Sequence, residues 1–242
     1  LTSNDLGKDN AAYGFRALYS NMEGDSNVAV GYYALLDNTY GDSNTAVGDS
    51  SLNNNTTGGK NTALGEFSLA SNTTAGSSTA VGYKALQNAT GDSNTAMGFH
   101  AGDVITSGRG NIIIGENSDP SAADTHYEIV IGAGATGKGT HKAVIGSNST
   151  TDVYMSQDMG ATVHADGVKF YEDTANGTNY VGFNSAATLG GDQVWTLPAA
   201  DGSANEVLKT DGSGTLSWTA NSGSGASAID DLSDGKSGGT DF

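Results

Sequence analysis

Apolar and polar residues recur in a fixed order along residues 1–150 of the chain. The clearest copy is Asn-Thr-Ala-Val-Gly at residues 44–48, and each copy ends on a glycine. Successive glycines lie 17, 17, 17, 17, 16, 17, 17 and 14 residues apart. They are Gly14, Gly31, Gly48, Gly65, Gly82, Gly98, Gly115, Gly132 and Gly146. A period of this length is typical of a solenoid, whose units bury apolar residues only by stacking on one another.

Each copy predicts β structure. Residues rich in Val, Ile, Thr and Ala precede the glycine, and clusters of Asn, Asp, Gly, Ser and Thr follow it, which is the pattern of a strand and a turn. A unit of this length has room for two strands of about five residues and two turns. The sequence therefore predicts an all-β solenoid of about nine coils.

Two adjacent positions of the repeat are apolar. Ala is common two residues before the glycine, and a larger side chain stands directly before it. Neighbouring residues of a strand point to opposite faces, so both faces are predicted to be buried. The larger column is the predicted repeat core: Val30, Val47, Leu64, Val81, Met97, Ile114, Ile131 and Ile145. One coil has one interior, so the second face needs a partner, and the simplest partner is another copy of the chain.

A further apolar column is confined to repeats one to five. Leu stands four residues after the glycine there, from Leu18 to Leu86, and the next equivalent position is Gly102. A small residue, Ala or Ser, precedes that position in every repeat. We therefore expect close packing next to it and a shortened second strand from the sixth coil onward.

The period is lost after residue 150. Short β runs separated by Asp-Gly turns predict a small β-rich domain over residues 151–220. The runs are residues 152–155, 161–164, 168–171, 180–183, 194–197, 206–209 and 215–218. Residues 221–242 are rich in Gly and Ser, as in a linker toward a further module.

Composition narrows the classes of partner. The 242 residues carry a formal charge of -17 with only 10 Lys and Arg, so a nucleic-acid partner is not expected. Cys is absent, which excludes disulfides and thiolate metal sites. No apolar run is long enough for a membrane span. We expect a soluble protein for which salt screens the charge.

The repeats resemble two families of fibrous protein. Residues 27–35, 44–52, 61–69 and 78–86 are similar to the head of trimeric autotransporter adhesins of the YadA type and, more closely, to tail-fibre segments of marine phages. The resemblance implies a left-handed parallel β-roll in a homotrimer. Residues 195–218 resemble a segment common in phage fibres. The family thus implies a virion appendage, a tail fibre for host attachment; the alternative is a bacterial surface adhesin.

That resemblance implies partners of three kinds: further copies of the chain, other fibre or virion modules, and a host surface glycan or outer-membrane component. The candidate surface contacts lie where residues 119–127 depart from the repeat wording. They are Asp119, Pro120, Asp124, His126 and Tyr127. Ring side chains near the turns could also stack on a sugar, with packing at the coil edge as the alternative. They are Tyr32, Tyr33, Tyr40, Tyr83, Phe99 and His100.

Candidate chemistry is sparse, and we expect no enzyme. A polysaccharide-cleaving spike would need paired carboxylates in a groove, whereas the repeats are regular and poor in Glu. The glycine run 132–139 approaches a phosphate-binding loop but lacks the following helix. No cofactor is predicted. Asp25, Asp42 and Asp92 on stacked turns could share Ca²⁺ with carbonyl groups, with solvated turn residues as the alternative.

Overall fold

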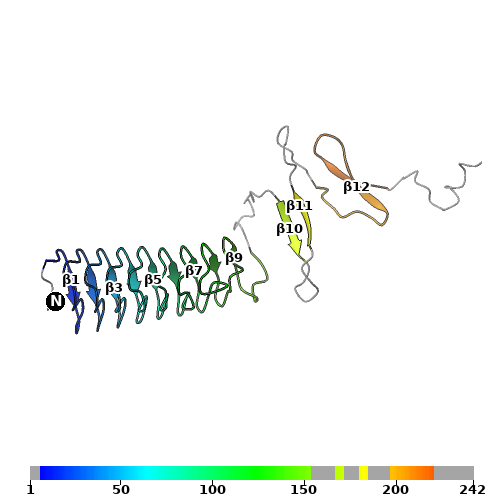
Figure 1. Cartoon of the computed structure of the whole chain (residues 1–242). Helices are drawn as coiled ribbons and strands as arrows, with labels where there is room; N and C mark the ends of the chain where they lie inside the picture. Colours follow the sequence, from blue (N-terminus) through cyan, green and yellow to red (C-terminus); the bar gives the residue numbers. More distant parts are fainter. Residues whose placement is uncertain (1–5, 154–166, 172–179, 185–196, 221–242) are drawn as a thin grey trace, which may run out of the picture. The chain divides into compact units, whose positions relative to one another are not determined.

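The computed structural model describes residues 6–153, 167–171, 180–184 and 197–220 (Figure 1). The chain divides into two compact units, Leu1–Ala161 and Thr162–Phe242. The first unit contains the predicted solenoid, with one strand per repeat (Figure 1). Its strands are β1 (Ala11–Tyr13), β2 (Val28–Val30), β3 (Thr45–Val47), β4 (Thr62–Leu64), β5 (Thr79–Val81), β6 (Thr95–Met97), β7 (Ile112–Ile114), β8 (Ile129–Ile131) and β9 (Ala143–Ile145).

These strands form one parallel nine-stranded sheet in sequence order. The register follows the repeat, so that Ala46 pairs with Ala29 on one side and with Ala63 on the other. Eight connections join the nine strands, and the described residues include no helix. The all-β parallel solenoid predicted from the glycine spacing is therefore confirmed.

Each coil has a single strand of three residues, so the prediction of two strands of about five residues was wrong. In coils one to five the chain after the strand glycine runs through turns in which two residues other than glycine adopt positive φ, for example Tyr33 (57°) and Leu35 (51°). Their amides point to opposite neighbours, since the Tyr33 amide donates to the Phe15 carbonyl and the Leu35 amide to the Ser51 carbonyl, both at 3.0 Å. Bonds between coils thus satisfy the backbone without a second strand.

The interior of the roll is filled by the smaller of the two apolar strand columns. Ala29, Ala46, Ala63, Ala80 and Ala96 are fully buried, and Ile113 and Val130 continue the column. Two further columns face them. One is the Ala or Ser three residues after the strand glycine in coils one to eight, and the other is the five buried Leu residues from Leu18 to Leu86. A coil this narrow accepts only Ala opposite Leu, because interiors are packed to nearly crystalline density.

The glycine that ends each strand is required by the stacking of the coils. Gly48 has a φ of +135°, and a Cβ added there would lie 2.6 Å from the carbonyl group of Gly65 in the next coil. The same clash recurs at Gly31 and Gly82. Glycine alone permits both this conformation and this approach, which explains why the residue marks every repeat.

Two ladders of asparagine tie the coils together inside the roll. In the first, the Asn44 amide nitrogen of the backbone donates to Asn27 Oδ1 at 2.9 Å, and Asn44 Nδ2 donates to the Gly58 carbonyl at 2.8 Å. In the second, Asn55 Nδ2 donates to Asn38 Oδ1 at 2.7 Å. Both sets are buried, where a paired amide stabilises and an unpaired one is costly.

The Leu column ends at the sixth coil without loss of packing. Gly102 takes the Leu position, and an added Cβ there would lie 3.1 Å from Leu86, 3.3 Å from Ile105 and 3.5 Å from Ile113. Ile105 and Ile113 are fully buried. The two isoleucines therefore occupy the space that Leu fills in the earlier coils.

The second unit contains two antiparallel pairs, β10 (Gly167–Tyr171) with β11 (Tyr180–Asn184) and β12 (Glu206–Thr210) with β13 (Leu216–Ala220). These match four of the predicted β runs. At the second turn Asp211 Oδ1 accepts from the amides of Ser213 (2.7 Å) and Thr215 (3.0 Å), and these bonds lower the pKa of Asp211. The predicted run 161–164 lies outside the described residues, as do residues 154–155 of the run 152–155, residues 194–196 of the run 194–197, and all of 221–242. The described ends of those two runs, residues 152–153 and 197, form no strand.

Candidate functional site

The larger apolar column of each strand faces outward. Val47 is 38% exposed while the neighbouring Ala46 is fully buried. Thr45 on the same outer face is half-buried. The eight predicted repeat-core residues thus lie on the outside of the single chain, as a continuous apolar row one residue wide in each of β2 to β9. Val28, Ile112 and Ile129, at the first position of their strands, lie on the same face, are also exposed and widen this outer strand face.

The turn aspartates contact backbone amides. Asp25 Oδ1 accepts from the Lys8 amide, Asp42 Oδ1 from the Asp25 amide and Asp92 Oδ1 from the Gly76 amide, each at 2.7 Å. These bonds connect successive coils along one edge. Among the described residues no three His, Asp or Glu side chains are grouped as metal ligands would be.

The predicted contact segment is only partly accessible. Asp124 and Tyr127 are exposed, Asp119 and His126 are half-buried, and Pro120 is buried. Pro120 therefore offers no surface for a partner. Tyr127 stacks on His141 with ring centroids 5.2 Å apart, and His126 Nδ1 accepts from the Arg109 amide at 3.1 Å, so this segment also packs against its neighbouring coils.

Burial raises the pKa of Asp119, and the Asp103 carboxylate adds to the shift. A backbone hydrogen bond from Val104 and the nearby His100 oppose it. Asp119 Oδ1 is buried and accepts no hydrogen bond from the described residues, while a backbone bridge joins Asp119 to Thr136. Asp119 therefore packs within the edge of the coil.

Glu128 is a fully buried carboxylate that sequence reasoning missed. It takes the place of Asn in the first ladder, and its backbone amide donates to Asn111 Oδ1 at 2.9 Å. Its side chain accepts from the Ser121 amide (3.0 Å) and hydroxyl (3.1 Å), from the Gly139 amide (2.7 Å) and from the Lys138 amide. Burial alone would raise the pKa of Glu128, but these bonds lower it.

The Glu128 carboxylate also bears on the glycine run 132–139, which approached a phosphate-binding loop in sequence. The amides of Lys138 and Gly139, which a phosphate would need, donate to Glu128. The chain then enters β9, as the sequence analysis expected. The sequence did carry one signal for this carboxylate: Glu128 is the one Glu at the position four residues before the strand glycine, which Asn occupies in most repeats.

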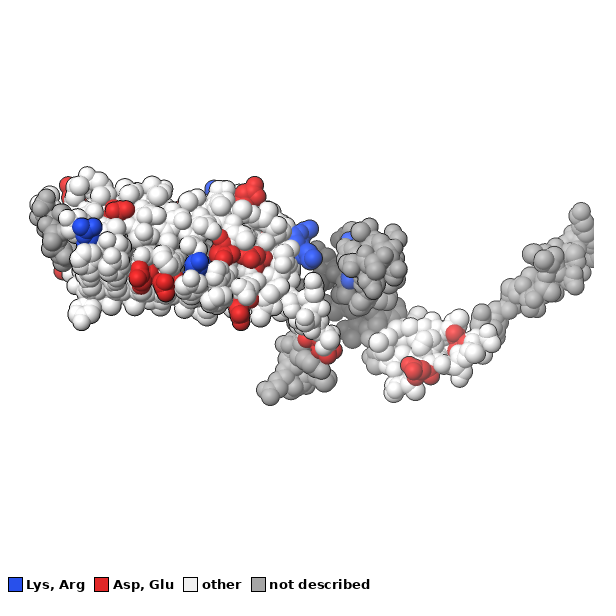
Figure 2. All heavy atoms as spheres, turned by 90° about the horizontal axis from the view of Figure 1, so that it is seen from below, with Lys and Arg blue, Asp and Glu red and all other residues white. Residues whose placement is uncertain are grey.

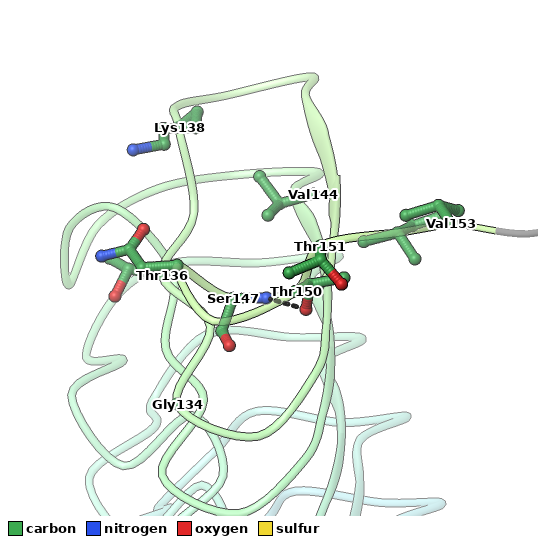
Figure 3. A pocket seen from close by; sticks show the side chains of 11 residues that line it. Gly134, Thr136, Lys138, Val144, Ser147, Thr150, Thr151 and Val153 are labelled. Atoms are coloured by element: carbon green, nitrogen blue, oxygen red, sulfur yellow. Dashed lines mark hydrogen bonds between the residues drawn. The ribbon is translucent and has the colours of Figure 1, made fainter. Parts of the chain in front are cut away.

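A cavity of about 320 Å³ lies at the C-terminal end of the roll (Figure 3). Thr136, Lys138 and Val144 line it together with Ser147 and Thr150. The Ser147 amide donates to Thr150 Oγ1 at 2.9 Å, and this bond holds the turn that forms part of the cavity wall (Figure 3). Lys138 is the one charged residue among those that line the cavity, which lies where the stack of coils ends.

Aromatic side chains gather on a second surface, one and two residues after the strand glycines. Phe15 and Tyr32 stack with centroids 5.3 Å apart and planes at 15°, and Tyr83 and Phe99 stack at 5.3 Å and 18°. Tyr33 lies against Tyr32, with ring centroids 4.0 Å apart. These rings pack on one another and are still partly exposed. Packing at the coil edge and a surface for sugar stacking are therefore compatible.

Charge is sparse over the outer surfaces. Figure 2 shows Lys and Arg as isolated positions on the face in view, among uncharged and acidic residues. The described part of the chain therefore offers no basic stripe on that face. In the same part, no helix is long and apolar enough to cross a membrane.

Comparisons with known proteins do not extend this picture. No protein-family model, curated protein or solved structure matches the chain. The fold and the surfaces described above carry the functional argument.

Proposed function

We propose that this chain is a structural and adhesive module of a phage tail fibre, a rigid homotrimeric rod that presents binding surfaces for host-cell attachment without catalysis. The outer strand face is the observation that carries the proposal. It carries a large apolar side chain in each of β2 to β9, beside Thr45 in β3 and its equivalents in β4 to β6, and an apolar row of this length marks an interaction surface.

The occupant we propose for that face is the same face of two further copies. Every copy carries an identical row in an identical register, so closed rotational symmetry would pair the rows along their whole length. Val30, Val47 and Leu64 are 37–38% exposed, so completing their burial would contribute roughly 0.5–1 kcal/mol for each side chain. The number three and the left hand of the roll come from the resemblance to autotransporter heads and phage fibres.

Rigidity is the second element of the proposal. Eight coil steps of about 4.8 Å give a rod of about 38 Å. Backbone bonds, asparagine ladders and turn carboxylates link each coil to the next, so little of the coil can move alone. A surface built on such a rod keeps its spacing under load.

The proposal that the module has no catalytic activity rests on the positions of the carboxylates among the described residues. Glu128 is buried and Asp119 half-buried within the coil edge, and the Glu128 carboxylate is occupied by hydrogen bonds from backbone amides and the Ser121 hydroxyl. The exposed carboxylates lie along a convex repeat. Two groups converging on one reacting atom, as hydrolysis requires, are not found among the described residues.

The second candidate is the head of a bacterial trimeric surface adhesin, favoured by the likeness of the repeats to YadA-type heads. The likeness of residues 195–218 to phage fibres favours the first. Antibodies against the chain, applied to virions and to cells of the source culture in the electron microscope, separate the two. Label on tail appendages supports the proposal, whereas label confined to the cell envelope contradicts it.

A further inference from the structure

A row of six residues runs along the roll directly after the strand glycines of coils one to six. In order they are Phe15, Tyr32, Asp49, Glu66, Tyr83 and Phe99; we name them the aromatic-acidic band. Each glycine ends its strand in a bend, so the band lies beyond the outer strand face.

Hydrogen bonds between coils hold the band in register. The carbonyl of each member accepts from an amide of the following coil, as Tyr32 does from Ser50 (2.8 Å), Asp49 from Phe67 (2.9 Å) and Glu66 from Lys84 (3.0 Å). Successive members are therefore about 4.8 Å apart along the roll. The band is a fixed array of side chains and not a loop.

Its chemical order is ring pair, carboxylate pair, ring pair. The two ring pairs are the stacked Phe15 with Tyr32 and Tyr83 with Phe99. Phe15, Tyr32 and Phe99 are 58%, 46% and 49% exposed, and Asp49 and Glu66 between the pairs are exposed as well. Asp49 is close enough to act on Tyr32: a hydrogen bond with Tyr33 raises the pKa of Tyr32, and the Asp49 carboxylate adds to that rise.

Cations flank the rings and set the charge of a fitting ligand. The Arg16 guanidinium lies 5.5 Å from the centre of the Phe15 ring and 5.2 Å from that of Tyr19, and Lys84 Nζ lies 5.3 Å from that of Tyr83. A polyanion would meet Asp49 and Glu66, and a polycation would meet Arg16 and Lys84. Charge therefore disfavours both.

A chain of neutral sugars satisfies each of these features. The C–H faces of pyranose rings pack on exposed aromatic rings, as apolar ligand faces do on aromatic walls, and sugar hydroxyls donate to carboxylates. We propose that the aromatic-acidic band binds a neutral glycan chain that runs along the roll, with Tyr32 and Tyr83 as stacking platforms and Asp49 and Glu66 as hydroxyl acceptors. This inference rests on the proposed attachment role and names the ligand class for it.

The test uses the full chain on immobilised hexasaccharides of three kinds: neutral (cello-, malto- and hexa-N-acetylchitohexaose), anionic (alginate) and cationic (chitosan). The expected result is binding to at least one neutral chain that changes little with salt. Tyr32→Ala with Tyr83→Ala should weaken it at least about tenfold, since each platform contributes on the order of one stacking contact. Tyr40→Ala is the matched control: Tyr40 was among the predicted stacking residues and is 52% exposed, but it lies outside the band and the inference assigns it no contact.

Asp49→Ala with Glu66→Ala provides a second variant on exposed positions, so that the test survives a folding defect in the tyrosine variant. Loss of binding in both double variants, with Tyr40→Ala unchanged, supports the inference. Binding to no neutral chain, binding to charged chains alone, or equal binding by all variants overturns it. The oligomeric state of the same samples is a separate readout: a trimer without glycan binding removes this inference and leaves the proposed rod intact.

Discussion

The first five coils and the last four share the parallel strand ladder but are held together by different residues. In coils one to four, Leu stands four residues after the glycine and Asn seven after it, for example Leu69 and Asn72. In the sixth coil these two positions hold Gly102 and Ile105, so the buried apolar side chain has moved from one position to the other. The fifth coil is intermediate, with Leu86 followed by Ala89.

This difference teaches that the coil geometry depends on filled volume and paired amides, and not on one residue at each position. Where Asn is lost, an apolar side chain closes the space, and where the first ladder ends, Glu128 gathers the free amides of the last turns. The N-terminal coils are thus stabilised by uniform ladders and the C-terminal coils by single, local contacts. Changes in the two halves should therefore have different effects.

The largest effect is expected at a strand glycine in the uniform half. Gly65→Ala places a Cβ 2.4 Å from the Gly82 carbonyl oxygen at a φ of +134°, and we expect a loss of about 3 kcal/mol or more in the free energy of unfolding. Gly134→Ala is the control, because its φ is +63° but no atom lies within 4 Å of the added Cβ. Urea unfolding should give about 1 kcal/mol for the control, and equal losses would refute the role assigned to coil contact.

The interior strand column should be destabilised by opposite changes in side-chain size in the two halves: a smaller residue in the C-terminal half and a larger one in the N-terminal half. Ile113→Ala should cost about 2–4 kcal/mol, because it leaves a cavity beside Ile105. Ala63→Ile should cost about 1–3 kcal/mol, because the space opposite is filled by Leu. Thermal unfolding of both variants and of Val47→Ala, whose side chain is outside, provides the measurement. A stabilised Ala63→Ile variant would show that the N-terminal interior is not full.

Glu128 should act locally and with pH. Glu128→Ala leaves amides of Ser121, Lys138 and Gly139 without their acceptor, and we expect a loss of about 1–3 kcal/mol together with faster amide exchange at these residues. Because its folded pKa is lowered, the stabilisation is present above the unfolded value of about 4.3 and disappears as the pH falls through the folded pKa. A stability difference between variant and parent that stays constant from pH 7 to pH 2 would contradict this assignment.

The smallest effect is expected where the second asparagine ladder stops. Asn72 Oδ1 accepts no hydrogen bond within the described part of the chain, because the next coil has Ala89 there. Ala89→Asn should extend the ladder and stabilise by about 0.5–1 kcal/mol, seen as a higher midpoint of thermal unfolding. Ala89→Ser is the control, since a hydroxyl is too short to donate to Asn72. Destabilisation by Asn alone would mean that the space at Ala89 closes with the ladder.

Much of the roll could be predicted from the sequence, because the repeat fixes position and register together. A glycine every 17 residues places Ala46 beside Ala29 and Ala63, and the structure pairs them so. The Asp211-Gly212 turn was equally readable, since Asp and Gly have specific roles in tight turns. These predictions depend on local chemistry repeated or concentrated in a few residues.

The three-residue strands could not be predicted in the same way. Leu35 and its equivalents adopt positive φ, which is rare for a residue with a branched side chain and has no signal in composition. The larger apolar column was predicted as the repeat core, yet the Ala column fills the interior of the single coil. Only Ala46 and its equivalents fit opposite the buried Leu column. Pro120 was expected outside because it breaks the repeat, yet its ring is buried at the coil edge.

Light scattering on the purified chain at micromolar concentration tests the central claim, that the outer strand face is covered by copies of the same chain. We expect a mass three times that of the chain. The double variant Val47→Lys with Leu64→Lys should lower this mass, because it places charges on the covered face. A parent chain that is folded and monomeric at this concentration would contradict the account.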